Sequence, residues 1–247
     1  MSDLPIAKAV GTSEQPEAPS AGQTTIIRIS RLGVVNAYLV VEDDGLTLID
    51  TGLPGAQRRI LERAGALERP IVRIVLTHAH SDHIGSLDAL ATALPGVEVI
   101  VSAREAPLLE GDKRLREGEP QNRVRGSFPS AATSPTRTVD DGEHVGSLRV
   151  IATPGHTPGH VSFFDPRDGT LYAGDVFTNH GGLATSAVVH WRFPIAGLAT
   201  WSRKLELDSA RRLRDLVPAR LAPGHGPVLE APAPAIQHAI TAAANRA

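Results

Sequence analysis

The 247-residue sequence has no cysteine, few aromatic residues and little net charge. Without cysteine there can be no disulfides or thiolate ligands, so any metal site must use histidine and carboxylate. Aromatic residues make up 4%, too few for the stacking platforms that bind single-stranded nucleic acid. The formal charge of −2 gives no basis for a nucleic-acid or membrane partner, and no apolar run is long enough to span a membrane. We therefore expect a small-molecule substrate, while nothing in the sequence indicates an oligomeric state.

Residues 1–22 are rich in serine, glutamate, proline, alanine and glycine without any period, which predicts a disordered tail. This segment has neither a basic start nor a continuous apolar stretch, so it does not resemble a secretory signal. The cytoplasm is the expected location. The hydrophobic content of 41% is sufficient for a substantial core, and we expect residues 23–247 to form a single domain.

The most informative stretch is Thr-His-Ala-His-Ser-Asp-His at positions 77–83. The apolar, β-branched run of residues 71–76 predicts a buried strand before it, and helical spacing of apolar residues predicts a helix over 85–94. The stretch therefore lies on a loop at the carboxyl end of a strand, a common position for chemistry in α/β folds.

Four of the six residues from 78 to 83 are of metal-ligand type. In an extended segment, His78 and His80 point to the same side and can bind one metal, whereas a change of chain direction would aim Asp82 and His83 at a second. Neutral imidazole and carboxylate are the ligands that zinc accepts when thiolates are absent. A single His-x-His would fit a solvated polar turn equally well, but this density of ligands favours a metal site.

The same pattern of an apolar strand followed by a tight turn and a ligand-type residue recurs along the chain. Predicted strands at 46–49, 145–152, 170–173 and 220–222 are followed by Asp50, His156, Asp175 and His225, respectively. Asp50 is either a turn carboxylate or an acceptor that orients a ligand histidine. His160, within Thr-Pro-Gly-His-Thr-Pro-Gly-His, is predicted to be a structural histidine bonded to backbone.

Two segments resist interpretation from sequence. Residues 110–138 contain few apolar anchors, which fits either a lid over the site or a solvated surface insertion. Their arginines fit either an anionic substrate or scattered surface charge. Residues 180–193 contain His180, His190, Trp191 and Phe193, which can line a pocket or simply pack. Helices are predicted at 198–207, after Asp208, and from 232 onward.

From about Thr24 to Gly226, the sequence resembles the metallo-β-lactamase-fold hydrolases. The resemblance rests on Asp-Thr-Gly at 50–52, the stretch at 77–83, the paired Pro-Gly-His turns, Gly-Asp-Val-Phe at 174–177 and Pro-Gly-His-Gly at 223–226. It implies an α/β fold, a four-layer αββα sandwich with halves near residues 23–140 and 141–247. The metals would lie at one edge of the sheets.

The resemblance also implies roles for the candidate residues and two divalent metal ions, with zinc expected and iron or manganese as alternatives. The first metal would be bound by His78, His80 and His156, the second by Asp82, His83 and His225, with Asp175 bridging both. A hydroxide shared by the metals would cleave an ester, lactone or thioester-type bond. Asp82 would orient it and carry a proton to the leaving group, and Asp50 would support the ligands.

At several positions this sequence differs from known subfamilies of these hydrolases. The differences reduce the number of candidate activities but do not identify a substrate. Metallo-β-lactamases usually carry cysteine or serine at the position of Asp175, and the homoserine-lactone lactonases carry a tyrosine where this chain has Val176, Phe177 and Thr178. Only about twenty residues follow Gly226, whereas glyoxalase II enzymes add a glutathione-binding region there. The alternatives are a β-lactam or phosphodiester hydrolase and a mononuclear-iron persulfide dioxygenase. The complete second ligand set argues against the dioxygenase.

Overall fold

The computed structural model describes residues 26–31 and 33–246, so the predicted disordered tail, residues 1–22, lies outside the described residues. The elements of the first half are β1 (Ile27–Arg31), β2 (Val35–Glu42), β3 (Gly45–Ile49), α1 (Gln57–Gly65), β4 (Ile71–Val75), α2 (Ser81–Ile84), α3 (Leu87–Ala93), β5 (Glu98–Ser102), α4 (Ala106–Leu109) and β6 (Arg137–Val139). The second half contains β7 (His144–Val145), β8 (Leu148–Ala152), β9 (Val161–Asp165), β10 (Thr170–Asn179), β11 (Leu183–Thr185), α5 (Pro194–Ala199), α6 (Arg203–Arg214), β12 (Arg220–His225), β13 (Leu229–Glu230) and α7 (Ala233–Ala244). None of the helices in this described part has the length and hydropathy needed to cross a membrane.

The strands form one mixed sheet in the order β6-β5-β4-β3-β2-β12-β10-β9-β8-β7, with β1, β11 and β13 paired beside it. At its centre, β2 and β12 share only one register pair, Val35 with His225. This narrow junction nearly divides the sheet into two half-sheets, β1–β6 and β7–β13. The division falls between β6 and β7, near residue 140.

Side chains on opposite faces of a strand enter different cores, because successive residues of a strand point to opposite sides. On β2, Leu39 belongs to the core beneath α1 and α3, whereas its neighbour Tyr38 lies in the core between the half-sheets. There the Tyr38 ring meets the Tyr172 ring edge-on, with centroids 5.3 Å apart. A third core packs β10 and β12 against α6 and α7.

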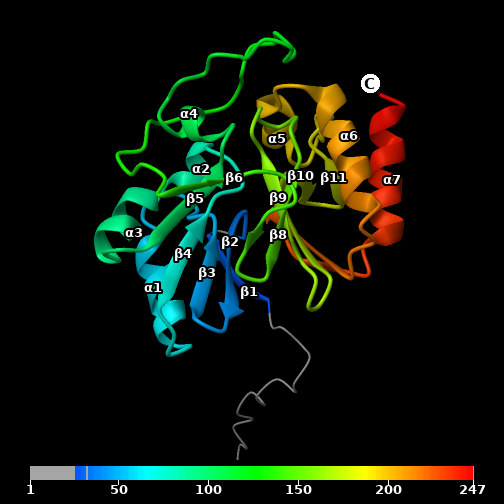
Figure 1. The fold of residues 1–247 in the computed structure, drawn as a ribbon. Helices are drawn as coiled ribbons and strands as arrows, with labels where there is room; N and C mark the ends of the chain where they lie inside the picture. Colours follow the sequence, from blue (N-terminus) through cyan, green and yellow to red (C-terminus); the bar gives the residue numbers. More distant parts are fainter. Residues whose placement is uncertain (1–25, 32, 247) are drawn as a thin grey trace, which may run out of the picture.

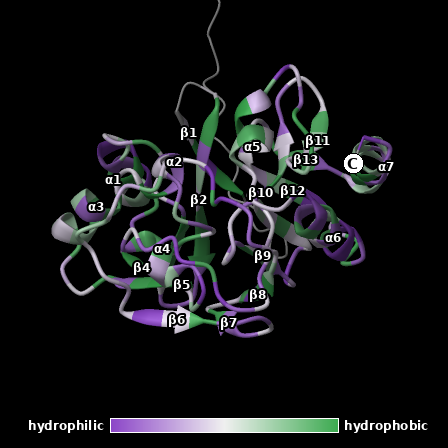
Figure 2. Cartoon of the chain, turned by 90° about the horizontal axis from the view of Figure 1, so that it is seen from above, coloured by the Kyte–Doolittle hydropathy of each residue, from purple (hydrophilic) through white to green (hydrophobic). Residues whose placement is uncertain are grey.

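Three cores between four layers make the αββα sandwich that the sequence analysis expected, and this prediction is confirmed. Helices α1 and α3 cover one side of the strands, and α6 and α7 cover the other (Figures 1 and 2). The loops bearing the ligand-type residues lie at the edge of the strands where α2 and α5 are found (Figure 1).

Two predicted boundaries were wrong. Asp175 was expected at the end of a strand, but β10 continues to Asn179 through register shifts on both sides of Gly174. Gly174 has a φ of +53°, so the chain bulges there and then resumes pairing. Asp208 was expected to separate a helix at 198–207 from a second helix, but the break falls earlier, between α5, which ends at Ala199, and α6, which begins at Arg203. Asp208 lies inside α6, because buried Leu207, Ala210 and Leu213 continue one apolar face.

Candidate metal centre

All seven ligand-type residues predicted from the sequence meet at one edge of the sandwich. Their nitrogen and oxygen atoms form three groups, each within 4.8 Å: His78, His80 and His156; His78, His83 and Asp175; and Asp82, His83 and His225. All except Asp82 are buried. Segments more than 140 residues apart in sequence therefore form one compact cluster.

The first group consists of three imidazoles whose ring nitrogens converge. His80 Nδ1 lies 3.1 Å from His78 Nε2 and 3.0 Å from His156 Nε2. The His78 ring meets the other two rings nearly perpendicularly. Three nitrogens at the corners of a small triangle match one face of a tetrahedral metal site.

The remaining residues, Asp82, His83 and His225, form the second group together with Asp175, which links the two, and this group contains the carboxylates. His225 Nε2 lies 3.1 Å from Asp175 Oδ2 and 3.4 Å from Asp82 Oδ2, and His83 Nε2 lies 3.3 Å from Asp175 Oδ1. Asp175 Oδ2 is also 3.4 Å from His156 Nε2 in the first group. The Asp175 carboxylate thus stands between the two groups, with one oxygen or the other near histidines of both.

In each histidine of the first group, one ring nitrogen faces the cluster and the other, the outer nitrogen, faces away from it. The hydrogen-bond partner of the outer nitrogen shows which of the two carries the proton. The Thr77 hydroxyl donates to Asp50 at 2.8 Å, so it can only accept from His78 Nδ1, 3.0 Å away. His80 Nε2 donates to the Arg125 carbonyl at 3.0 Å. Hence His78 Nε2 and His80 Nδ1 both turn lone pairs inward.

His156 also carries its proton on the outer nitrogen, which is bonded to Thr200, the residue after α5. The Thr200 hydroxyl donates to a backbone carbonyl, that of Ser186 or Ala196, and therefore accepts from His156 Nδ1 at 3.1 Å. Its Nε2 is left with a lone pair. The three converging nitrogens of the first group therefore repel one another unless a cation lies between them.

The two histidines of the second group are oriented in the same way. His83 Nδ1 donates to Asp50 at 2.8 Å, and His225 Nδ1 donates to the Val34 carbonyl at 3.1 Å. Both turn Nε2 toward the carboxylates. His83 Nε2 and Asp175 Oδ1 have no hydrogen-bond partner among the described residues, which is unusual for buried polar atoms. The donor set and these two atoms fit divalent cations.

Electrostatics separate the two groups. Burial lowers the pKa of His80 to about 4 and holds the pKa of His78 and His156 well below the usual range, so all three are neutral at pH 7. Burial also lowers the pKa of His225, but Asp175 and Asp82 outweigh it and raise that pKa to about 9. The carboxylates of the second group therefore stabilise a positive charge beside them. In the first group the three imidazoles stay unprotonated at pH 7, so only a bound cation can supply positive charge there.

Asp50 lies behind the cluster and has an unusual backbone conformation. Its φ is +58°, in the left-handed region that non-glycine residues rarely adopt. One carboxylate oxygen accepts from the Thr77 N–H at 2.8 Å, and the other accepts from the Thr77 hydroxyl and from His83 Nδ1. Asp50 thereby fixes the orientation of the loop before His78 and the tautomer of His83.

Asp82 is the most accessible member of the cluster, with its side chain 26% exposed. It follows Ser81 at the start of the single-turn helix α2 and lines a cavity of about 260 Å³. The same cavity is lined by His80, His156, Asp175 and His225 on one side and by α5 on the other. A small molecule in this cavity would lie directly against both groups.

Sequence reasoning missed a buried glutamate that joins two of the ligand-bearing loops. Glu105, just before α4, accepts from the Ala79 N–H at 2.9 Å, the Thr157 hydroxyl at 2.7 Å and the Gly159 N–H at 2.9 Å. Burial raises its pKa to about 7 despite these three donors. No motif marks it, because its partners lie 26 to 54 positions away in sequence.

A second missed glutamate, Glu206 on α6, is also buried, and burial raises its pKa to about 8. It accepts from the Ser186 hydroxyl at 2.6 Å. The predicted structural role of His160 agrees with its contacts, since its Nε2 accepts from the Asp175 N–H at 3.1 Å. Phe193 packs between His180 and His225, with ring centroids 5.0 and 4.8 Å away, whereas Trp191 is 77% exposed.

The fold and the site together define a class: a four-layer α/β protein with a histidine and aspartate centre for divalent metal at one sheet edge. The sequence profile of the Metallo-beta-lactamase superfamily matches residues 30–225, and the chain belongs to this superfamily of metal-dependent hydrolases. The chain is 46% identical over 207 residues to the uncharacterized protein YobT of Bacillus subtilis, a match that covers 83% of this chain and 89% of that one.

Two further relatives bear on chemistry. Hydroxyacylglutathione hydrolase GloC of Haemophilus influenzae is 30% identical over 153 residues, which cover 59% of this chain and 68% of that one. The crystal structure of TTHA1623 in a di-iron-bound form is similar with a TM-score of 0.62 and 29% identity, covering 85% of this chain and 96% of that one.

Proposed function

We propose that the protein is a binuclear metallohydrolase that cleaves an ester, lactone or thioester-type bond. In this proposal His78, His80 and His156 hold one divalent cation, and Asp82, His83 and His225 hold the other, with Asp175 between them. The observation that carries it is the direction of the hydrogen bonds. Each of the five histidines has its outer nitrogen bonded to an acceptor and its inner nitrogen turned toward the cluster, in the orientation that binding a cation requires.

Two divalent cations bound there would polarise a carbonyl and make a water molecule acidic near neutral pH. The chain's own contribution is orientation and proton transfer. The Asp82 carboxylate faces the cavity, so it can accept a proton from the attacking water and deliver it to the leaving group. Asp50 and the carbonyl of Arg125 hold His83 and His80 in the required tautomers.

The relationship to GloC supports thioesters as one substrate class, and the di-iron-bound neighbour supports iron as an alternative to the expected zinc. Neither identifies the substrate or the metal of this chain. Persulfide dioxygenation on a single iron is the rival activity, and the presence of a second group of ligand-type residues favours hydrolysis over it.

The proposal is tested by measuring metal content and activity on one preparation. The purified protein, loaded with zinc, iron or manganese, is analysed for bound metal and assayed on lactones, esters, thioesters, phosphodiesters and a β-lactam. We expect about two equivalents of metal and turnover of an ester, lactone or thioester. Full activity at one equivalent, with oxygen consumed on a persulfide, would contradict the binuclear hydrolase.

A further inference from the structure

A second and larger cavity adjoins the one beside the metal centre. Its volume is about 900 Å³, and it is lined by the segment between α4 and β6 together with Leu198 of α5. Gly126 lines both cavities, so the two are adjacent there. We call this larger space the loop cleft. Its volume is in the range of sites that hold whole small molecules.

The loop wall of the cleft is attached to the metal centre. The Arg125 carbonyl accepts from His80, and the Ser127 carbonyl accepts from the Ser81 N–H at 2.9 Å. A Cβ at Gly126 would lie 2.1 Å from His80 Nε2, so only glycine allows this close approach. Trp201 also donates its indole N–H to the Asn122 carbonyl at 3.1 Å. The segment is therefore held in place beside the site.

The charge of the cleft is one-sided. Its lining includes Lys113, Arg123 and Arg125 and, among the described residues, no aspartate or glutamate. None of these three cations forms an ion pair within residues 26–31 and 33–246; Lys113 lies over the ring of Phe128, 4.8 Å from its centroid. By contrast, neighbouring Arg104 and Arg114 are paired with Glu119 and Asp112.

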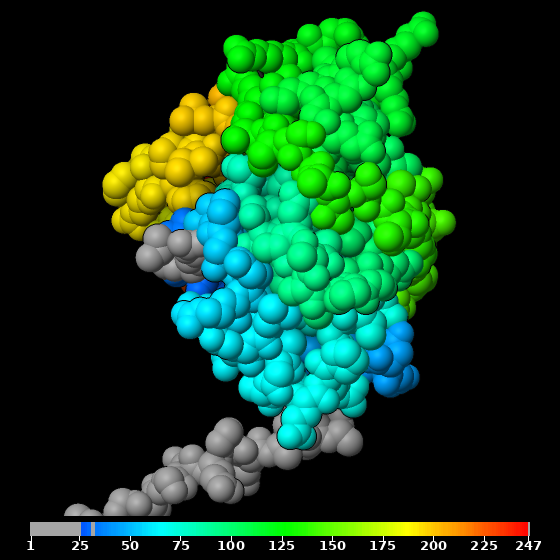
Figure 3. Space-filling view, turned by 90° about the vertical axis from the view of Figure 1, so that its left-hand side faces the viewer, coloured from blue at the N-terminus to red at the C-terminus, as the bar shows by residue number. Residues whose placement is uncertain are grey.

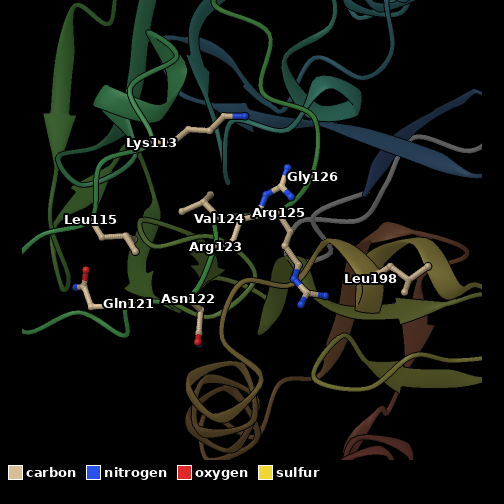
Figure 4. A pocket seen from close by; sticks show the side chains of 9 residues that line it. All are labelled: Lys113, Leu115, Gln121, Asn122, Arg123, Val124, Arg125, Gly126 and Leu198. Carbon is tan, nitrogen blue, oxygen red and sulfur yellow. The ribbon is translucent and has the colours of Figure 1, made fainter.

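The three side chains project from the loop on one side of the cleft, and Leu198 projects from α5 on the opposite side (Figure 4). In the space-filling view, the green loop forms the top of the molecule and the yellow segment before α5 protrudes beside it (Figure 3). A concave space with unpaired cations on one wall attracts anions and raises their local concentration.

We propose that the loop cleft binds an anionic group of the substrate, a carboxylate or a phosphate, while the bond to be hydrolysed lies at the metal centre. This inference rests on the proposed hydrolase function and adds the substrate class to it. The recognised molecule is an ester or thioester with at least one negative charge remote from the reacting carbonyl. Lys113 and Arg123 are specificity residues, since both line the loop cleft and neither lines the cavity beside the metal centre.

The experiment compares substrates that share a reacting bond and differ in remote charge. Butyryl-coenzyme A and the neutral S-butyryl-N-acetylcysteamine differ in the leaving group, whereas mono(4-nitrophenyl) glutarate and its methyl ester differ in the acyl group. Wild type is compared with the Lys113→Gln/Arg123→Gln double variant, which leaves Arg125 and its contact with His80 unchanged. The control, Arg114→Gln/Arg116→Gln, removes the same charge from the same loop outside the cleft.

We expect the cleft variant to lose about tenfold or more in kcat/KM on the anionic member of at least one pair, through KM, and less than about twofold on the neutral member. The control should retain the wild-type preference, and added salt should reduce that preference. The coenzyme A pair tests a phosphate on the leaving group, and the glutarate pair a carboxylate on the acyl group. Equal losses on both members of both pairs, or no loss on either anionic member, would overturn the proposal.

A protein without hydrolase activity would require a separate test of the anion site. If the metal-loaded wild type cleaves none of these four substrates and no lactone, the hydrolase proposal fails, and calorimetric titration with S-butyl-coenzyme A and with glutarate then tests the cleft alone. Binding of either ligand by wild type and by the Arg114→Gln/Arg116→Gln control, weakened about tenfold in the cleft variant, would support the anion site. The same affinity in all three proteins, or no binding of either ligand to wild type, would refute it.

Discussion

The metal centre and the loop between α4 and β6 are adjacent, but they are built in opposite ways. At the metal centre all ligand-type side chains except Asp82 are buried, and every histidine has its outer nitrogen fixed by a protein acceptor. In the loop, by contrast, cationic side chains such as Arg123 and Arg125 are exposed and unpaired, although the backbone that carries them is anchored. The protein thus fixes the geometry of the metal centre, whereas it leaves the cationic side chains of the loop free to contact a ligand.

This difference predicts different consequences of substitution. A buried group whose partners are all specified cannot be changed without leaving another polar atom unpaired. An exposed side chain without protein partners can be changed with little effect on folding. Substitutions at the centre should therefore reduce kcat or metal binding, and substitutions in the loop should alter substrate preference.

The largest effect is expected for Asp82→Asn. The amide binds metal more weakly than a carboxylate, and it cannot accept a proton from water. We expect kcat to fall at least about 10²-fold and to remain low when metal analysis shows both sites filled. Activity near the wild-type rate with two bound metals would rule out Asp82 as the proton carrier.

Asp50→Asn should have a smaller effect of a different kind. Asp50 makes no contact with the cavity, but it accepts three hydrogen bonds from Thr77 and His83, and an amide can replace only part of this set. We expect a loss on the order of 10–100-fold in metal affinity or activity, partly restored by excess metal. Titration of activity against metal concentration distinguishes this variant from Asp82→Asn, and loss of activity that metal does not restore would contradict the orienting role.

The sequence was sufficient for the fold and for the residues that converge, because motif and strand pattern mark each of them locally. It was insufficient for the partners that hold them. Thr200 orients His156 from 44 positions away, and Glu105 joins two loops that are distant in sequence. Such contacts arise only when the layers pack. The bulge at Gly174 likewise explains why the sequence pattern predicted the end of a strand where β10 in fact continues.

Glu105→Gln tests whether burial raises the pKa of the glutamate that joins the two ligand-bearing loops. Because burial raises the pKa of Glu105 from 4.5 to about 7, the folded state holds a proton that the unfolded state has released between these pH values. Glu105 therefore makes the wild type less stable as pH rises from 4.5 to 7, by on the order of 3 kcal/mol, whereas the amide that replaces it in the variant cannot titrate. Denaturant unfolding at pH 5 and at pH 8 should show that the variant gains stability relative to wild type as the pH rises from 5 to 8. A difference that does not change with pH would mean that Glu105 titrates normally.

The smallest effect is expected where the loop meets the body of the protein. Arg104 donates two hydrogen bonds to Glu119, and both side chains are largely buried, at 13% and 19% exposure. Arg114 makes a similar pair with Asp112, but its own side chain is 89% exposed. Solvent screening makes exposed pairs nearly neutral in energy, so Arg104→Gln should lower the free energy of unfolding by about 1 kcal/mol, whereas Arg114→Gln should leave it nearly unchanged. Because Arg104 lies outside the metal centre, its substitution should leave kcat on a neutral ester unchanged. It should raise KM only for an anionic substrate, through a less ordered loop. A fall in kcat on the neutral ester would mean that the loss of order extends to the Arg125 carbonyl that orients His80.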